Sequence, residues 1–361
     1  MSSESVLVCE KLRKAYDGFV ALEGLDLEIP AGSVFGYIGH NGAGKTTTIR
    51  MLAGLLLPSD GRASICGYDV VKDRNQIKSL LGYMPDNFGV YDQMRVWEYL
   101  DFFGAAYKIP RKERIRRLDY VLEMTEGEYM RDRFVDTLSK GMKQRVGIAR
   151  TLMHDPKVIL LDEPANGLDP RARVQMRELI RKLADNGKTI LVSSHILPEL
   201  AAICNLVGIL HRGRLLASGT IDDVLKNLHR DRLMEAKLKG DITAAQDVLK
   251  NDAKAAEIQV SEIDSNMLQF RYSGDDDSLA DLLAAINNAG SRVVTFREVP
   301  LSLEDAYMTI SAMGLEGDET ADDAVPATAE ESQNKGILQE GQCAGCCKCD
   351  DIGSCEEHAD E

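Results

Sequence analysis

The sequence lacks any run of about eighteen apolar residues, the length that a membrane-spanning helix needs. Its first residues, Met1 to Glu10, also lack the basic and apolar regions of a signal peptide. We therefore expect a cytoplasmic protein that reaches a membrane only through a partner. With 361 residues, 44% of them hydrophobic, the chain can fill the cores of two packed domains.

The sequence also lacks the net positive charge with which proteins bind polyanions. Its formal net charge is −15, and the segment from Glu316 to Glu361 alone contains fourteen Asp or Glu and two Lys. The rest of the chain is therefore nearly neutral. Nucleic-acid binding usually depends on a concentrated basic surface, so we expect no nucleic-acid partner. Residues 314–361 are acidic and poor in apolar residues, which predicts a disordered tail.

Cysteine is scarce in the body of the chain and crowded in the tail. Cys9, Cys66 and Cys204 are isolated, and we expect them to be small buried side chains. A cytoplasmic protein rarely forms structural disulfides, so the tail cysteines are better interpreted as thiols or metal ligands. One hypothesis is a site for zinc or another soft metal; the alternative is a flexible tail that collects cysteines without binding metal. The candidate ligands are Cys343, Cys346, Cys347, Cys349, Cys355 and His358.

The order of apolar patterns predicts an α/β core with two additions. Short alternating runs over residues 6–37 suggest a small antiparallel sheet. Strand patterns at 34–38, 158–161 and 189–193, with helix patterns at 45–57 and 171–184, predict a mostly parallel sheet. Helical patterns over residues 93–153 interrupt this core and indicate an inserted helical subdomain, at about residues 87–153.

A glycine-rich loop follows the first buried strand and precedes a helix. Two glycines separated by four residues and followed by Lys and Thr match the P-loop spacing. Glycines let backbone N–H groups converge on phosphates, Lys45 can reach the β- and γ-phosphates, and Thr46 can bind Mg²⁺. A plain glycine turn is the alternative, but the flanking strand and helix favour a phosphate loop. The predicted nucleotide-binding residues here are Gly39, Asn41, Gly42, Gly44, Lys45, Thr46 and Thr47.

Two carboxylates end the buried strand at 158–161. Asp162 is placed to hold Mg²⁺ directly or through water, and Glu163 is free to polarise an attacking water. Adjacent acids after a strand are common by chance. Together with the phosphate loop, they predict hydrolysis of a nucleoside triphosphate.

The segment from Leu138 to Arg145, about twenty residues before Asp162, resembles the signature loop of the ATP-binding-cassette, or ABC, family. The family has Gly where Lys140 stands and Gln where Met142 stands, whereas the other characteristic positions match. Ser139 could instead be a simple helix cap. The resemblance implies an ABC cassette of the P-loop NTPase fold over about residues 1–220, which uses ATP and Mg²⁺.

The resemblance extends to three further segments. Tyr16 resembles the aromatic residue that stacks on adenine. The loop from Asn166 to Asp169 resembles the loop that crosses the dimer, and His195 resembles the switch histidine. The family pattern implies a homodimer in which Ser139 and Gly141 of one copy cover the ATP of the other. It also implies that Glu163 acts as the general base and His195 contacts the γ-phosphate.

One position departs from the family. Tyr83-Met84-Pro85 is followed by Asp86, where the family usually has Gln. An aspartate is shorter and cannot donate a hydrogen bond, but its hard oxygen can serve Mg²⁺. We therefore expect Asp86 to be a third Mg²⁺ ligand beside Thr46 and Asp162, or a coupling residue.

After the cassette, alternating strand and helix patterns between 233 and 297 predict a small α+β accessory domain, within residues 221–313. The segment Ser302 to Tyr307 resembles the end of such domains in export systems, although it could be only a capped helix start. The resemblance implies an exporter ATPase bound to a separate multispan permease at the inner face of the plasma membrane. The alternative is a soluble ABC ATPase that assists metal-cluster assembly or another non-transport process.

Overall fold

A computed structural model describes residues 5–89, 91, 93–228, 232–239, 242–261, 264–299, 303–304 and 307–308. The cysteine-rich tail, with its candidate metal ligands, lies outside these residues. The expected N-terminal antiparallel sheet is present, in the strand order β2-β1-β4-β5. Cys9 and Cys204 are buried as expected, whereas the prediction for Cys66 was wrong, because it lies half-buried in the turn between β4 and β5. The strands are β1 (Ser5–Tyr16), β2 (Phe19–Pro30), β4 (Asp60–Ile65) and β5 (Tyr68–Asp69).

A six-stranded sheet forms the centre of the fold, in the order β10-β9-β3-β8-β7-β6, with only β10 antiparallel to its neighbour. Its inner strands are apolar without alternation because both faces are covered. Strands β3, β8 and β7 are neighbours, so the loops that follow them meet at one edge. The strands are β3 (Val34–Ile38), β6 (Leu81–Met84), β7 (Val158–Asp162), β8 (Thr189–Ser194), β9 (Leu206–His211) and β10 (Arg214–Thr220).

The helix after the glycine-rich loop is shorter than the apolar pattern predicts. It ends at Leu52 rather than Leu57, because Gly54 takes a left-handed conformation (φ +69°) that terminates the helix. Leu55 and Leu57 are consequently exposed. The helices that flank the central sheet are α1 (Lys45–Leu52), α2 (Arg74–Leu80), α6 (Pro170–Asp185), α7 (Leu197–Ala201) and α8 (Ile221–Leu228).

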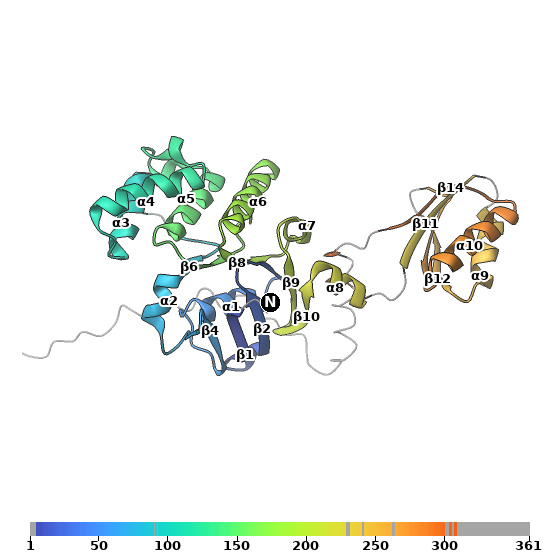
Figure 1. The fold of residues 1–361 in the computed structure, drawn as a ribbon, viewed down its shortest axis with the longest axis horizontal. Helices are drawn as coiled ribbons and strands as arrows, with labels where there is room; N and C mark the ends of the chain where they lie inside the picture. The colour runs from blue at the N-terminus through green and yellow to red at the C-terminus, as the bar shows by residue number, and fades with distance from the viewer. Residues whose placement is uncertain are drawn as a thin grey trace, which may run out of the picture. The chain divides into compact units, whose positions relative to one another are not determined.

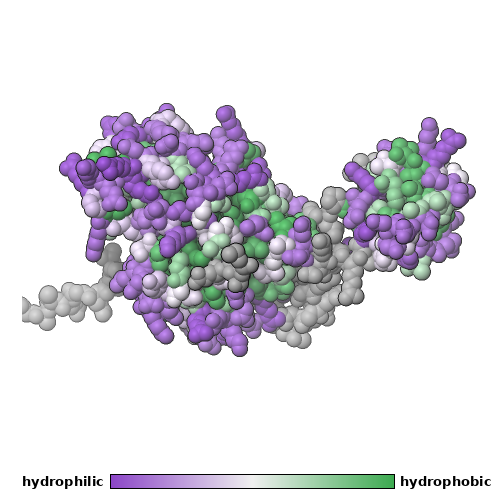
Figure 2. Space-filling model, in the orientation of Figure 1, coloured by the Kyte–Doolittle hydropathy of each residue, from purple (hydrophilic) through white to green (hydrophobic). Residues whose placement is uncertain are grey.

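The inserted helices gather into one layer, seen in green in Figure 1. Polar and charged side chains cover most of the face that they show in Figure 2. Among the described residues, no helix is both long and apolar enough to cross a membrane. The elements are α3 (Val96–Ala106), α4 (Arg111–Met124), η1 (Glu128–Met130), η2 (Val135–Thr137) and α5 (Lys140–Leu152).

Beyond residue 231, a four-stranded sheet of order β12-β13-β11-β14 packs two helices around a core of its own. Leu303, after this sheet, is only 4% exposed and belongs instead to the core that contains Ile38 and Leu161. The chain thus returns to the cassette core after the second sheet. The elements are β11 (Arg232–Lys239), α9 (Ile242–Asn251), β12 (Ala255–Val260), β13 (Met267–Tyr272), α10 (Asp276–Asn288) and β14 (Arg292–Glu298).

Candidate active site

The loop between β3 and α1 requires or favours glycine at three of its positions. Gly44 has φ +105°, and a Cβ added there would lie 2.5 Å from the carbonyl oxygen of Ala21. A Cβ on Gly39 would lie 2.6 Å from the carbonyl oxygen of Leu210. Gly42 has φ +83°, which is also strained for other residues. The loop therefore packs closely against two neighbouring backbones, and it leads into the N-terminus of α1, where backbone N–H groups can line a phosphate cradle.

Lys45 is anchored inside this loop. Its Nζ donates to the carbonyl oxygens of Gly39, at 2.6 Å, and His40, at 3.3 Å. The same nitrogen lies 3.2 Å from Glu163 Oε1, and the lysine side chain is only 6% exposed. A buried ammonium needs such partners. The cation therefore stands between the phosphate loop and the end of β7.

Asp162 connects the end of β7 to β8 and to the first turn of α1. Thr46 Oγ1 donates to Asp162 Oδ1 at 3.2 Å, and Ser193 Oγ donates to the same oxygen at 2.7 Å. Burial raises the pKa of Asp162, the two hydroxyl hydrogen bonds lower it, and the nearby carboxylates of Glu163 and Asp86 raise it further. A bound cation would offset both the cost of burying the Asp162 carboxylate and its repulsion from the two neighbouring carboxylates.

Glu163 is held in a strained backbone conformation. It has φ +49°, although it is not glycine, and its N–H donates to Ser193 Oγ at 3.0 Å. Its Oε2 lies 2.9 Å from His195 Nδ1, so the carboxylate bridges His195 and Lys45. Left-handed residues of this kind cost about 1–3 kcal/mol and cluster at active sites.

Ser193 is the residue that sequence reasoning missed. Its hydroxyl is fully buried and bonds both the side chain of Asp162 and the backbone of Glu163. The available signal was a small polar residue at the end of an otherwise apolar strand pattern, Thr189 to Ser193. The partner of that hydroxyl lies 31 residues away in sequence and becomes visible only when β7 and β8 pair.

Asp86 follows β6 and reaches the loop after β7. Its Oδ1 accepts from Asn166 Nδ2 at 3.2 Å, and its Oδ2 accepts from Asn87 Nδ2 at 3.3 Å. Asp86 thus belongs to the same group as Asp162, on which its charge acts. It also ties the inserted helical region to the loop that leads from Glu163 to Asp169.

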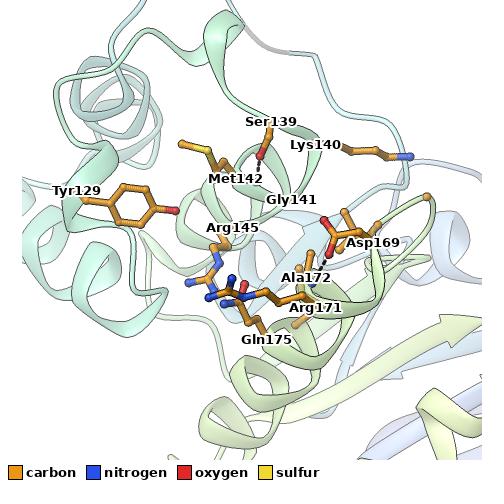
Figure 3. A pocket seen from close by; sticks show the side chains of 13 residues that line it. Tyr129, Ser139, Lys140, Gly141, Met142, Arg145, Asp169, Arg171, Ala172 and Gln175 are labelled. Carbon is orange, nitrogen blue, oxygen red and sulfur yellow. Dashed lines mark hydrogen bonds between the residues drawn. The ribbon is translucent and has the colours of Figure 1, made fainter.

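The signature loop lies elsewhere, in a pocket between the starts of α5 and α6 (Figure 3). Ser139 caps α5 by accepting from the backbone N–H of Met142 at 3.3 Å. Asp169 caps α6 by accepting from Ala172 at 2.9 Å. Gly141 lines the same pocket, and the side chain of Lys140 covers Gly167. Ser139, Gly141 and Asp169 are therefore together, but not with the phosphate loop of their own chain.

Three further predicted nucleotide contacts lie in or near the phosphate loop or at the end of β1. Asn41 lies exposed in the phosphate loop, and Thr47 occupies the first turn of α1. Tyr16 lies at the end of β1 and is 45% exposed, with Lys14 Nζ 5.0 Å from its ring centroid. Tyr16 thus presents an aromatic face to solvent, outside the hydrogen bonds that join Lys45, Asp162 and Glu163.

The donor set fits ATP with Mg²⁺. The glycine cradle at 39–44 has no room for Cβ atoms at two of its positions, and Lys45 supplies a fixed positive charge. Thr46 and Asp162 present two hard oxygens 3.2 Å apart, the ligand type that Mg²⁺ prefers. The arrangement can bind a triphosphate and activate water beside its γ-phosphate.

Known proteins with similar sequences are ATP-binding components of transport systems. A family model described as "ABC transporter" matches residues 22–166. An ABC transporter ATP-binding protein of Synechocystis sp. is 36% identical over 290 residues, which cover 80% of this chain and 77% of that protein. The Nod factor export ATP-binding protein I of Cupriavidus metallidurans is 32% identical over 308 residues, or 85% and 97% of the two chains.

Solved structures give the same fold. The structure of an ATP-binding subunit of an ABC transporter is similar with a TM-score of 0.57 and 33% sequence identity. The match covers 62% of this chain and 93% of that one. The expected fold, an α/β cassette with antiparallel and helical additions, is thereby confirmed.

Proposed function

Because this chain belongs to the family of ABC transporter ATP-binding proteins, whose cassettes bind and hydrolyse ATP with Mg²⁺, we propose that it powers an exporter. In this proposal, ATP closes a dimer of two cassettes, hydrolysis reopens it, and a separately encoded permease follows the motion. The chain then resides at the inner face of the plasma membrane through that permease.

The observation that carries the dimer is the separation of two half-sites. One group consists of Lys45, Asp162, Glu163 and His195. The carboxylate of Glu163 lies 3.2 Å from Lys45 Nζ and 2.9 Å from His195 Nδ1, and Ser193 Oγ links Asp162, at 2.7 Å, to the backbone of Glu163, at 3.0 Å. Lys45 Nζ also donates to two carbonyl oxygens of the phosphate loop, at 2.6 and 3.3 Å. Ser139, Gly141 and Asp169 line a different pocket. Two copies arranged head to tail bring each group against the complementary group of the other copy.

Each residue of the first group has a chemical role in this proposal. Mg²⁺, when bound, neutralises charge on the phosphate oxygens. Thr46 and Asp162 hold it, with Asp86 as a third ligand or as a link to the helical region through Asn166. Lys45 holds the β- and γ-phosphates, and Asn41 and Thr47 bind beside it. Tyr16 stacks on the adenine.

Glu163 is the general base in this proposal and removes a proton from the attacking water. A carboxylate placed between Lys45 and His195 has a set orientation, and His195 can turn its second nitrogen to the γ-phosphate and the attacking water. Ser139 and Gly141 of the second copy, at the N-terminus of α5, stabilise the charge that develops on the phosphate.

Export is supported by relatives rather than by the site. The Nod factor protein is named for export, and an ATP-binding protein of Bacillus subtilis that is 31% identical is named for linearmycin resistance. Assistance to metal-cluster assembly is the second candidate. It depends on the tail cysteines, outside the described residues, so the proposal that they bind zinc or another soft metal stays a prediction.

The test combines an activity with a capture experiment. The purified chain is expected to hydrolyse ATP in a Mg²⁺-dependent reaction. The tagged chain, extracted from its native membranes in detergent, is expected to retain a multispan membrane protein. Capture of a soluble cluster-assembly scaffold in place of a membrane protein would instead support the second candidate.

A further inference from the structure

We propose that Tyr307 is a positioning residue for ATP hydrolysis and acts on His195 from outside the nucleotide-binding loops. This inference rests on the proposed function and extends it to residues 303, 304, 307 and 308, which follow the second sheet. Tyr307 lines one pocket together with residues of the active site.

The pocket lies on the first half of the phosphate loop. It is lined by Gly39, His40 and Asn41 from that loop, by His195 after β8, and by Tyr307; Ile38 and Leu197 complete it. His195 is 42% exposed and is bonded to Glu163 through Nδ1. The tyrosine ring therefore bounds the space in which the imidazole and the side chain of Asn41 can move.

The tyrosine is held there by packing. Residues 303, 304, 307 and 308 are helical. Leu303 is 4% exposed within the cassette core, and Tyr307 packs against the same core. Glu304 and Met308 are exposed, and Met308 is 69% exposed. Leu303 and Tyr307 thus pack on the cassette core, and Tyr307 also lines the pocket beside His195.

A short connection joins this anchor to the second sheet. The N–H of Val299, just after β14, donates to the carbonyl oxygen of Leu233 in β11 at 2.8 Å. Only three residues separate Val299 from Leu303, and four residue steps span at most about 14 Å. A large displacement of the second sheet must therefore pull on Leu303 and, through it, on Tyr307. The accessory domain would in this way tune hydrolysis.

The test is a set of single variants of the full chain, assayed for ATP hydrolysis. Tyr307→Ala is expected to lower kcat about tenfold with KM for ATP changed less than about threefold, because geometry rather than nucleotide binding is lost. Tyr307→Phe keeps the ring and is expected to retain kcat. Leu303→Ala is expected to reproduce the loss by loosening the anchor, and Met308→Ala, on the exposed face, is the matched control.

A double-mutant cycle separates positioning from a general structural effect. If Tyr307 acts through His195, Tyr307→Ala has little further effect in a His195→Ala background, because residues in one functional unit are not additive. Equal losses in both backgrounds, or a kcat for Tyr307→Ala equal to that of Met308→Ala, would overturn the inference. A wild-type chain without ATPase activity would refute the proposed function itself, a result distinct from these.

Discussion

Glu163 Oε2 lies 2.9 Å from His195 Nδ1, so the loops after two neighbouring strands of the parallel sheet share one hydrogen bond. The other oxygen of that carboxylate lies 3.2 Å from Lys45 Nζ. The orientation of the carboxylate therefore depends on the phosphate loop and on the end of β8 together. A change at Lys45 or at His195 should therefore alter the orientation of the Glu163 carboxylate.

Replacing Glu163 by glutamine should nearly abolish turnover and trap the ATP-bound dimer. The amide keeps the shape and can still contact His195, but it cannot take a proton. General-base catalysis contributes about 10²- to 10⁴-fold, so kcat should fall by at least about a hundredfold. Steady-state ATPase assays and size-exclusion chromatography with ATP measure both effects. Glu178→Gln, an exposed change of the same kind in α6, is the control; unchanged turnover in Glu163→Gln would remove Glu163 from the role of base.

Replacing Asp86 by asparagine should move the acid limb of the ATPase pH profile to lower pH. Asp86 raises the pKa of Asp162 through its charge, so its neutralisation lets Asp162 ionise at lower pH. The carbonyl of asparagine can still accept from Asn166. Rates measured from about pH 5 to 8, each divided by the maximum rate of the same protein, should therefore stay higher for the variant on the acid side. Asp185→Asn, an exposed change at the end of α6, should not move the profile; a shift to higher pH would contradict the argument.

Ser139 caps α5, and in the proposed dimer it also contributes to catalysis; two substitutions can separate these two roles. Ser139→Ala removes the cap of α5 and should cost about 1 kcal/mol of stability. Ser139→Asp retains a cap of equal quality but brings a negative charge toward the phosphate of the other copy. Thermal unfolding should thus be nearly normal for aspartate, and ATPase activity should be low in both. Normal activity in Ser139→Asp would mean that the pocket does not cover a nucleotide.

Ser193→Ala should destabilise the chain and weaken its use of Mg²⁺. The fully buried hydroxyl donates to Asp162 and accepts from the backbone of Glu163. An unsatisfied buried donor costs about 1–3 kcal/mol. Denaturant unfolding should report this loss, and half-maximal ATPase activity should require more Mg²⁺. Ser79→Ala, at an exposed position in α2, should change stability by less than about 0.5 kcal/mol.

Much of this protein was readable from the sequence because its chemistry is local. The phosphate loop, the Asp162-Glu163 pair and the signature loop are each short contiguous segments, and their flanking strand and helix patterns recur in the fold. Backbone conformation at Gly42 and Gly44 depends mainly on the residue type itself. The same holds for the cap at Ser139, whose partner is only three residues away.

Other features were decided by tertiary structure because their partners are distant in sequence. The bonds from Ser193 to Asp162 and from Asn166 to Asp86 bring together residues 31 and 80 positions apart. They exist because β6, β7 and β8 are neighbours in one sheet. The burial of Leu303 and the position of Tyr307 depend likewise on the chain's return to the first core. Sequence alone therefore determined which groups could handle a triphosphate, and packing determined which of them meet, because strand order carries no local signal.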